Sequence, residues 1–165
     1  MKRDHVLPTA GDTQALGRVL ADLLRPGDLL VLAGPLGAGK TALARALIQE
    51  RARAQNAPVE DVPSPTFTLV QVYELPDMTL WHFDLYRIGG PDEAWELGVE
   101  EAFESGISLI EWPERISALL PPDRLNVRLE FQPDATGRRA ILEGRGAWAA
   151  RLVSLWPEVQ AHAAA

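Results

Sequence analysis

The sequence predicts an α/β fold, a three-layer sandwich with a mostly parallel central sheet and antiparallel strands at its edges. Short apolar runs alternate with segments of helical periodicity, a pattern typical of parallel sheets covered by helices. The length of 165 residues suits one domain spanning residues 1–165. Residues 28–53 combine an apolar run, a glycine-rich turn and a helical segment, an order that places a loop at the carboxyl end of a buried strand.

Apolar spacing and capping signals predict the first elements. A helix is expected over residues 11–24, with Thr9 as its cap facing Asp12 three residues on. A fully buried strand is expected over 28–34, because its residues are almost continuously apolar. The helix after it is expected over 41–53.

The middle of the chain predicts a hairpin and then a helix and a strand. β-Branched and aromatic residues favour strands over 66–75 and 79–88, with a Pro-Asp turn between them. An acidic start predicts a helix over 91–105. The apolar run at 107–112 is expected to be another buried strand.

The last third is expected to end in a helix that packs on the domain. Its predicted elements are a short helix over 114–120, antiparallel strands over 124–131 and 138–144, and an amphipathic helix over 147–163. Pro157 is expected to interrupt that last helix. Its tryptophans are interpreted as packing residues.

Composition excludes several classes of function. The formal net charge is −7, from 23 acidic and 16 basic residues, which disfavours direct, tight binding of nucleic acid. The absence of cysteine excludes disulfides and thiolate zinc sites, and the scattered histidines favour oxygen ligands for any metal. No apolar run is long enough to span a membrane. The first residues lack the pattern of a secretory signal, so a cytoplasmic protein is expected.

The stretch "GPLGAGKT", residues 34–41, satisfies the phosphate-loop pattern G-x-x-x-x-G-K-[ST] between a strand and a helix. Its backbone N–H groups would converge on an anion, and the helix start adds a positive dipole end. Lys40 would reach the β- and γ-phosphates, and Thr41 would offer its hydroxyl to Mg²⁺. Lys40 is also the only lysine after Lys2. The fold prediction is therefore a P-loop NTPase.

Two carboxylates end apolar strands and could face this loop. Asp84 closes "TLWHFD" and Glu111 closes "ISLIE", and either could hold the metal or orient the attacking water. Hydroxyls of "SPTFT", residues 64–68, could close over a γ-phosphate. His82 is interpreted as a hydrogen-bonded packing residue, because a lone histidine in a strand is seldom a base.

Five phrases together go beyond a general phosphate loop: "GPLGAGKT", "SPTFTLVQVYE", "HFDLYRI", "ELGVEEAF" and "LIEWPER". In this order the chain resembles the TsaE family, also called YjeE, the small ATPases of bacterial tRNA threonylcarbamoyladenosine biosynthesis. The resemblance covers residues 6–145 and leaves the helix at 147–163 outside. It implies that ATP or ADP and Mg²⁺ are bound and that the chain hydrolyses ATP.

The resemblance also implies individual roles. The phosphates would be wrapped by Gly37, Ala38, Gly39, Lys40, Thr41 and Ala42, and the base would be flanked by backbone near Ala10 and Gly137. Thr41 and Glu111 would hold magnesium, with Asp84 as a Walker B-like carboxylate. The expected catalytic set is Lys40, Asp84 and Glu111. Thr66 and Thr68 would belong to a mobile, switch-like segment.

Three residues in or near this set carry further expectations. Trp112 is expected beside the nucleotide because it follows Glu111 directly. Pro35 and Ala42 depart from the usual family residues, an acidic or amide residue and a threonine, and are expected to shift nucleotide affinity while Thr41 retains the metal contact.

The implied partners are the TsaB and TsaD subunits, of which TsaD modifies the adenosine next to the anticodon. This chain would meet tRNA only indirectly, as a nucleotide switch with weak turnover of its own. The alternative is a small-molecule kinase of P-loop type, but Arg87 is the only arginine between Arg53 and Arg115, which argues against an arginine-rich lid. A GTPase is disfavoured because no lysine after Lys40 can form a guanine-reading motif.

Overall fold

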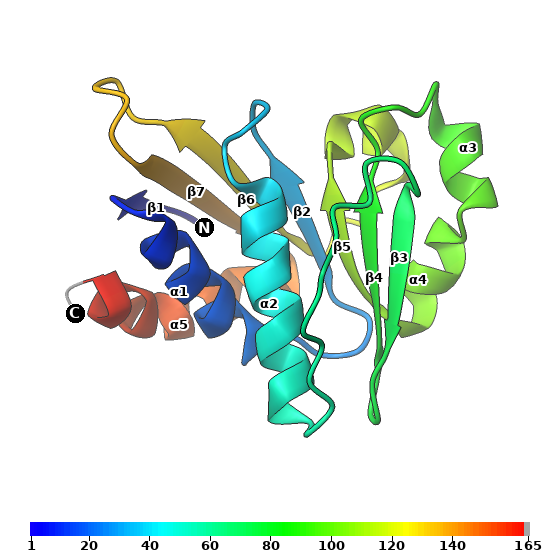
Figure 1. The fold of residues 1–165 in the computed structure, drawn as a ribbon, viewed down its shortest axis with the longest axis horizontal. Coiled ribbons are helices and arrows are strands. Elements are labelled where there is room, and N and C mark those ends of the chain that lie inside the picture. Colours follow the sequence, from blue (N-terminus) through cyan, green and yellow to red (C-terminus); the bar gives the residue numbers. More distant parts are fainter. Residues whose placement is uncertain (164–165) are drawn as a thin grey trace.

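A seven-stranded sheet forms the centre of the computed structural model, which describes residues 1–163 (Figure 1). The strands are β1 (Lys2–Leu7), β2 (Leu29–Ala33), β3 (Val70–Glu74), β4 (Thr79–Asp84), β5 (Ile107–Glu111), β6 (Arg124–Phe131) and β7 (Arg138–Arg145). The helices are α1 (Ala10–Ala21), α2 (Lys40–Ala54), α3 (Pro91–Glu96), α4 (Val99–Ser105), the 3-10 helix η1 (Pro113–Leu119) and α5 (Ala147–Ala163).

Strand order confirms the predicted fold class. The sheet runs β1-β7-β6-β2-β5-β4-β3, and the central strands β6, β2, β5 and β4 are parallel to their neighbours in that group. β3 joins β4 as the predicted antiparallel hairpin, and β7 and β1 add antiparallel strands at the other edge. In the β4–β5 register Asp84 lies opposite Glu111, so two strand-end carboxylates lie side by side.

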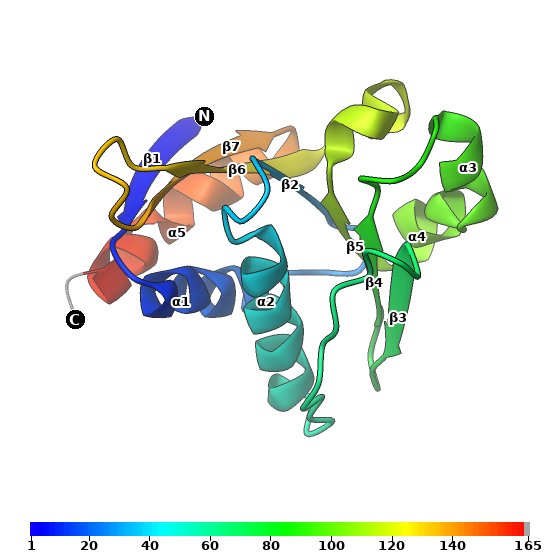
Figure 2. The same ribbon diagram turned by 45° about the horizontal axis from the view of Figure 1, so that its top comes forward.

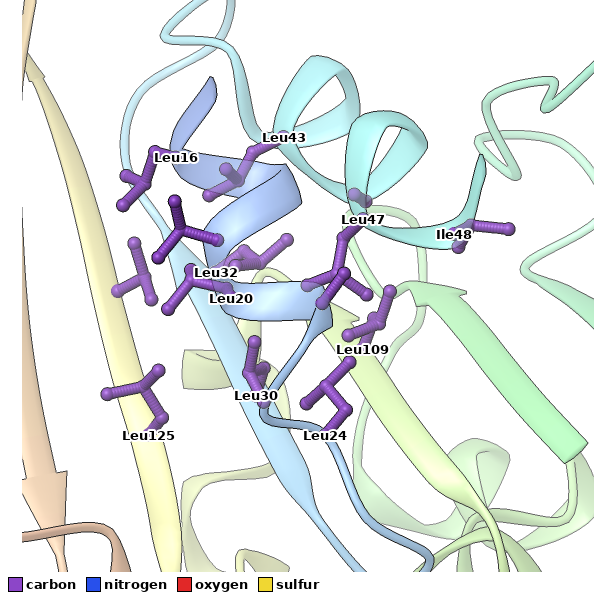
Figure 3. Packing of buried hydrophobic residues seen from close by; sticks show 14 of the residues in the cluster. Leu16, Leu20, Leu24, Leu30, Leu32, Leu43, Leu47, Ile48, Leu109 and Leu125 are labelled. Carbon is purple, nitrogen blue, oxygen red and sulfur yellow. The ribbon is translucent and has the colours of Figure 1, made fainter. Parts of the chain in front are cut away.

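Helices cover the two faces of the sheet and make two separate cores. Alternate residues of β2 point to opposite faces: Leu30 and Leu32 pack with α1, α2 and α5, while Leu29 and Val31 pack with α3, α4 and η1. Figure 2 shows α1 and α2 together on one side of the sheet. Figure 3 shows leucines of α1, α2 and the sheet meeting in the larger core.

Helix α1 begins as the sequence predicts. Thr9 and Asp12 form a reciprocal capping box, in which the Thr9 N–H donates to Asp12 Oδ2 at 2.7 Å and the Asp12 N–H donates to Thr9 Oγ1 at 3.3 Å. This cap satisfies backbone donors that the first helical turn leaves unpaired. It also fixes the chain between β1 and α1, directly beside the glycine loop.

Strand β1 was not predicted. Only His5 and Leu7 are buried, Lys2, Asp4 and Val6 are exposed, and Arg3 is partly exposed. Such a half-buried edge strand shows only a short apolar alternation, and it forms because β7 offers an antiparallel partner from Lys2 opposite Glu143 to Leu7 opposite Arg138.

Three expected elements differ in extent, and a fourth differs in continuity. The strand predicted over 79–88 ends at Asp84. The strand predicted over 66–75 begins at Val70, and residues 65–68 form a turn instead. The helix predicted over 91–105 is two helices, separated where Gly98 adopts a φ of +88°. Helix α5 continues through Pro157, so the expected interruption is wrong. Among the described residues, no helix has the length and apolar character needed to cross a membrane.

Candidate nucleotide-binding site

The glycine loop joins β2 to α2 in a backbone conformation that needs glycine. Gly34 has a φ of +143° and Gly39 a φ of +106°, values that other residues rarely adopt. A methyl group on Gly34 would overlap the carbonyl oxygen of Leu129 in β6. The first helical bond of α2 runs from the Leu43 N–H to the Gly39 carbonyl at 2.9 Å, so the preceding amides have no intrahelical partner and suit an anion.

Lys40 is held inside this loop. Its side chain reaches back so that Nζ donates to the carbonyls of Gly34 and Pro35, at 2.7 and 2.8 Å, and the residue is only 5% exposed. Burial lowers the pKa of the Lys40 ammonium, while the negative charges of Glu111, Glu114 and Asp84 act in the opposite direction. A cation fixed among loop carbonyls can meet an incoming phosphate with little reorganisation.

Thr41 and Glu111 meet across 70 positions of sequence. The Thr41 hydroxyl donates to Glu111 Oε1 at 2.8 Å and lies 3.1 Å from Oε2. Glu111 is 2% exposed and also contacts His82, whose Nε2 lies 2.7 Å from Oε2. The loop threonine and a strand-end carboxylate therefore form one connected polar group beneath α2.

Asp84 faces the segment at residues 64–68. Its Oδ2 accepts the Thr66 hydroxyl at 3.1 Å, and Thr66 in turn lies 2.7 Å from the Ser64 hydroxyl. The Tyr86 N–H donates to Oδ1 at 3.0 Å. Thr68 takes no part in this group: it is exposed and accepts a hydrogen bond from Gln71 at 3.1 Å.

Trp112 lies directly against the lysine of the loop. Lys40 Nζ is 4.2 Å from the centroid of the Trp112 ring, and the Tyr86 ring is 4.8 Å from it on a tilted approach. Trp112 has a φ of +60°, a strained value for an aromatic residue, and such strain occurs often at functional sites.

A hollow of about 240 Å³ adjoins the loop and brings distant segments together. It is lined by Ala10 and Thr13 of α1, by Gly37 to Gly39 and Ala42, and by Gly137 and Arg138. Ala10 and Gly137, predicted to flank the base, thus lie at one site. Arg138 was not predicted: it donates to the Gly37 carbonyl at 3.1 Å, and its sequence shows no signal beyond a position after a glycine.

The side chains around Thr41 offer mainly oxygen atoms as metal ligands. No cluster of three or more histidine, cysteine, aspartate or glutamate residues suited to a metal occurs in residues 1–163. A hydroxyl and two carboxylates, of Thr41, Glu111 and Asp84, are nevertheless the donor types that Mg²⁺ takes when phosphates and water complete its shell. The donor set fits a metal that arrives with a nucleotide.

A second hollow, of about 420 Å³, lies on the opposite face of the sheet. Its walls include Asn126 and Arg128 of β6, Glu143 of β7 and Pro113 of η1. It contains no residue of the glycine loop and neither Asp84 nor Glu111, so it lies apart from the residues predicted to bind a nucleotide.

Known proteins resemble the chain over most of its length. Residues 7–141 match the family model described as "Threonylcarbamoyl adenosine biosynthesis protein TsaE". A protein of Rickettsia conorii named tRNA threonylcarbamoyladenosine biosynthesis protein TsaE is 41% identical over 126 residues, which cover 76% of this chain and 70% of the relative. A Treponema pallidum protein of the same name is 35% identical over 139 residues, covering 81% and 93%.

A solved structure has the same arrangement. The crystal structure of YdiB from Bacillus subtilis superposes with a TM-score of 0.69 at 28% identity, covering 98% of this chain and 95% of that one. Because the superposition covers nearly all of both chains, the likeness is one of the whole fold.

Proposed function

The chain belongs to the TsaE family of threonylcarbamoyl adenosine biosynthesis proteins, and from this premise we propose that it binds and slowly hydrolyses ATP as a nucleotide switch. The switch acts on a complex of TsaB and TsaD during the biosynthesis of threonylcarbamoyladenosine in tRNA. The chain contacts these proteins, and tRNA is reached only through them. Its acidic net charge of −7 agrees with a subunit that does not bind RNA itself.

The observation that carries the proposal is the contact between Thr41 and Glu111, 2.8 Å long, beside a lysine enclosed by the loop. A glycine-rich turn alone needs neither group. A hydroxyl at the start of α2, paired with a buried carboxylate on the strand next to β2, is the arrangement that phosphate-loop enzymes use for a magnesium nucleotide.

Each part of the site has a distinct task in this proposal. Loop amides and the Lys40 ammonium bind the phosphates and offset their charge. Thr41, Glu111 and Asp84 would hold Mg²⁺, and the ion would supply charge neutralisation for the phosphates. The hollow lined by Ala10, Gly137 and Arg138 receives the base.

Glu111 and Asp84 have different neighbours, so we assign a different main role to each carboxylate. Glu111 contacts Thr41, so it is the stronger candidate for the metal. Asp84 contacts Thr66 at 3.1 Å, in a turn where Phe67 is 80% exposed. A partner that covers this turn would fix Thr66 and Asp84 together, and we propose that this contact orients the attacking water.

Phosphate release by the purified chain, measured with and without the TsaB and TsaD subunits, tests the switch. Alone, turnover should fall below the usual enzyme range of about 1 to 1000 per second, and the partners should raise it. Asp84→Asn and Glu111→Ala should each reduce the stimulated rate by about 100-fold, the scale of one preorganised group. Glu114→Gln is the matched control, because Glu114 is an exposed carboxylate near Lys40.

Two results would contradict the proposal. Rapid hydrolysis by the isolated chain, with no response to the partners, would remove the switch. Transfer of the phosphoryl group to a metabolite would restore the small-molecule kinase.

A further inference from the structure

His82 is a polar residue buried in an apolar sheet. It is 0% exposed and lies on β4 between Leu80 and Asp84 on the face that α2 covers. A leucine at this position would avoid the cost of removing an imidazole from water. A histidine here therefore needs a hydrogen-bond partner that offsets the cost of its desolvation.

The only hydrogen bond that this imidazole makes within residues 1–163 is to Glu111. Nε2 lies 2.7 Å from Glu111 Oε2, and Nδ1 is buried without a hydrogen-bond partner. With its proton on Nε2, the ring donates to the carboxylate and leaves only a lone pair unpaired on Nδ1. The ring's polar contact is thus directed entirely to this carboxylate.

The strand register explains how the ring reaches this carboxylate. His82 lies opposite Leu109, and Asp84 lies opposite Glu111. Glu111 is therefore the diagonal neighbour of His82 on β5, two residues beyond Leu109 and on the same face of the sheet. Glu111 consequently sits between a donor on β4 and a donor on α2, Thr41. Each donor comes from a different element.

We propose that His82 is a positioning residue, which holds the Glu111 carboxylate in the orientation that faces Thr41 and the magnesium of a bound nucleotide. This inference rests on the proposed nucleotide site. A hydroxyl such as that of Thr41 rotates freely, whereas a buried ring on a central strand has one packed orientation, so the ring limits how the carboxylate turns. Hydrogen-bonding partners of metal ligands commonly change metal affinity by about 10- to 100-fold when removed.

Calorimetric titration with ADP, once with Mg²⁺ and once with EDTA, tests this role. His82→Leu should weaken the binding of ADP in Mg²⁺ by about 10-fold or more and change binding in EDTA by less than about 2-fold, because loop amides and Lys40 contact phosphates in both conditions. His82→Gln should recover most of the lost affinity, because a glutamine amide can place an N–H near the position of Nε2.

Leu80→Val is the matched control, because Leu80 is buried on the same strand and the same face. It should lower thermal stability without changing the difference between Mg²⁺ and EDTA. Equal weakening of His82→Leu in both conditions, or no recovery in His82→Gln, would overturn the positioning role.

A spectroscopic measurement on the unsubstituted protein covers the case in which His82→Leu does not fold. In histidine-labelled protein, the Nε2–H proton of His82 should exchange slowly and resonate downfield, and Glu111→Gln should move that resonance. Absence of the resonance, or no response to Glu111→Gln, would overturn the inference. Failure of the unsubstituted protein to bind ADP with Mg²⁺ would overturn the proposed function instead.

Discussion

Replacing Lys40 with methionine separates the charge of this side chain from its bulk. In the structure Nζ donates to two loop carbonyls and the residue is 5% exposed. A charge-assisted contact from such an ammonium to phosphate contributes about 1.5 to 3 kcal/mol. At about 1.4 kcal/mol for each tenfold step, Lys40→Met should weaken ATP binding by about 10- to 150-fold.

The same substitution should have a smaller effect on the stability of the fold. The carbonyls of Gly34 and Pro35 lose their donor, which costs about 1 to 3 kcal/mol. Removing the buried ammonium recovers part of this cost, because its lowered pKa shows that burial disfavours the charge. The free energy of unfolding should therefore change by less than about 2 kcal/mol, within the range of ordinary point substitutions.

Calorimetry with a slowly hydrolysed ATP analogue measures the affinity, and urea denaturation measures the stability. Arg45→Met is the matched control, since Arg45 is an exposed cation of α2 that bonds Val62 at 3.1 Å and not the loop. An affinity of Lys40→Met within about twofold of the unsubstituted protein would refute the assignment of Lys40 to phosphate.

Three further predictions concern other parts of the molecule. Trp112→Phe should abolish the change in tryptophan emission on ADP binding, because Trp112 contacts Lys40; survival of the change would place the reporter elsewhere. Gly34→Ala should lower the free energy of unfolding in urea by about 3 kcal/mol or more, from its overlap with Leu129 and its positive φ; an unchanged denaturation midpoint would contradict this. Burial lowers the pKa of His5 below 6.5 despite nearby Asp12, so the unfolded chain takes up a proton first and the stability of the fold decreases as the pH drops through 6.5. His5→Gln should flatten that fall in denaturation curves, and an unaltered slope would argue against it.

The local order around the glycine loop was predictable from the sequence. The apolar run of β2, the pattern at residues 34–41 and the periodicity of α2 are all local signals, and each produced an element close to its expected place. Both carboxylates were expected at strand ends, where β4 and β5 indeed finish. Parallel neighbours end at the same edge of a sheet, so their proximity follows from the fold class.

Contacts between distant segments were not predictable in this way. The approach of His82 to Glu111 depends on the register of β4 against β5, and the pairing of β1 depends on β7 being available beside it. Arg138 likewise reaches Gly37 only because the β6–β7 hairpin brings it to the loop. Local propensity carries no information on these tertiary contacts.

The hollow beside the loop can be completed only late in protein synthesis. Its lining includes residues 8–13 near the start of the chain and residues 137 and 138 near its end, and β1 pairs with β7. A chain emerging from the ribosome with residue 1 first exposes the glycine loop about a hundred residues before residues 137 and 138, which is about 5 to 20 seconds at about 5 to 20 residues per second. Throughout that interval the nascent loop has its phosphate-binding amides but lacks the complete hollow, so full nucleotide affinity can arise only after the hairpin at residues 124–145 has been translated.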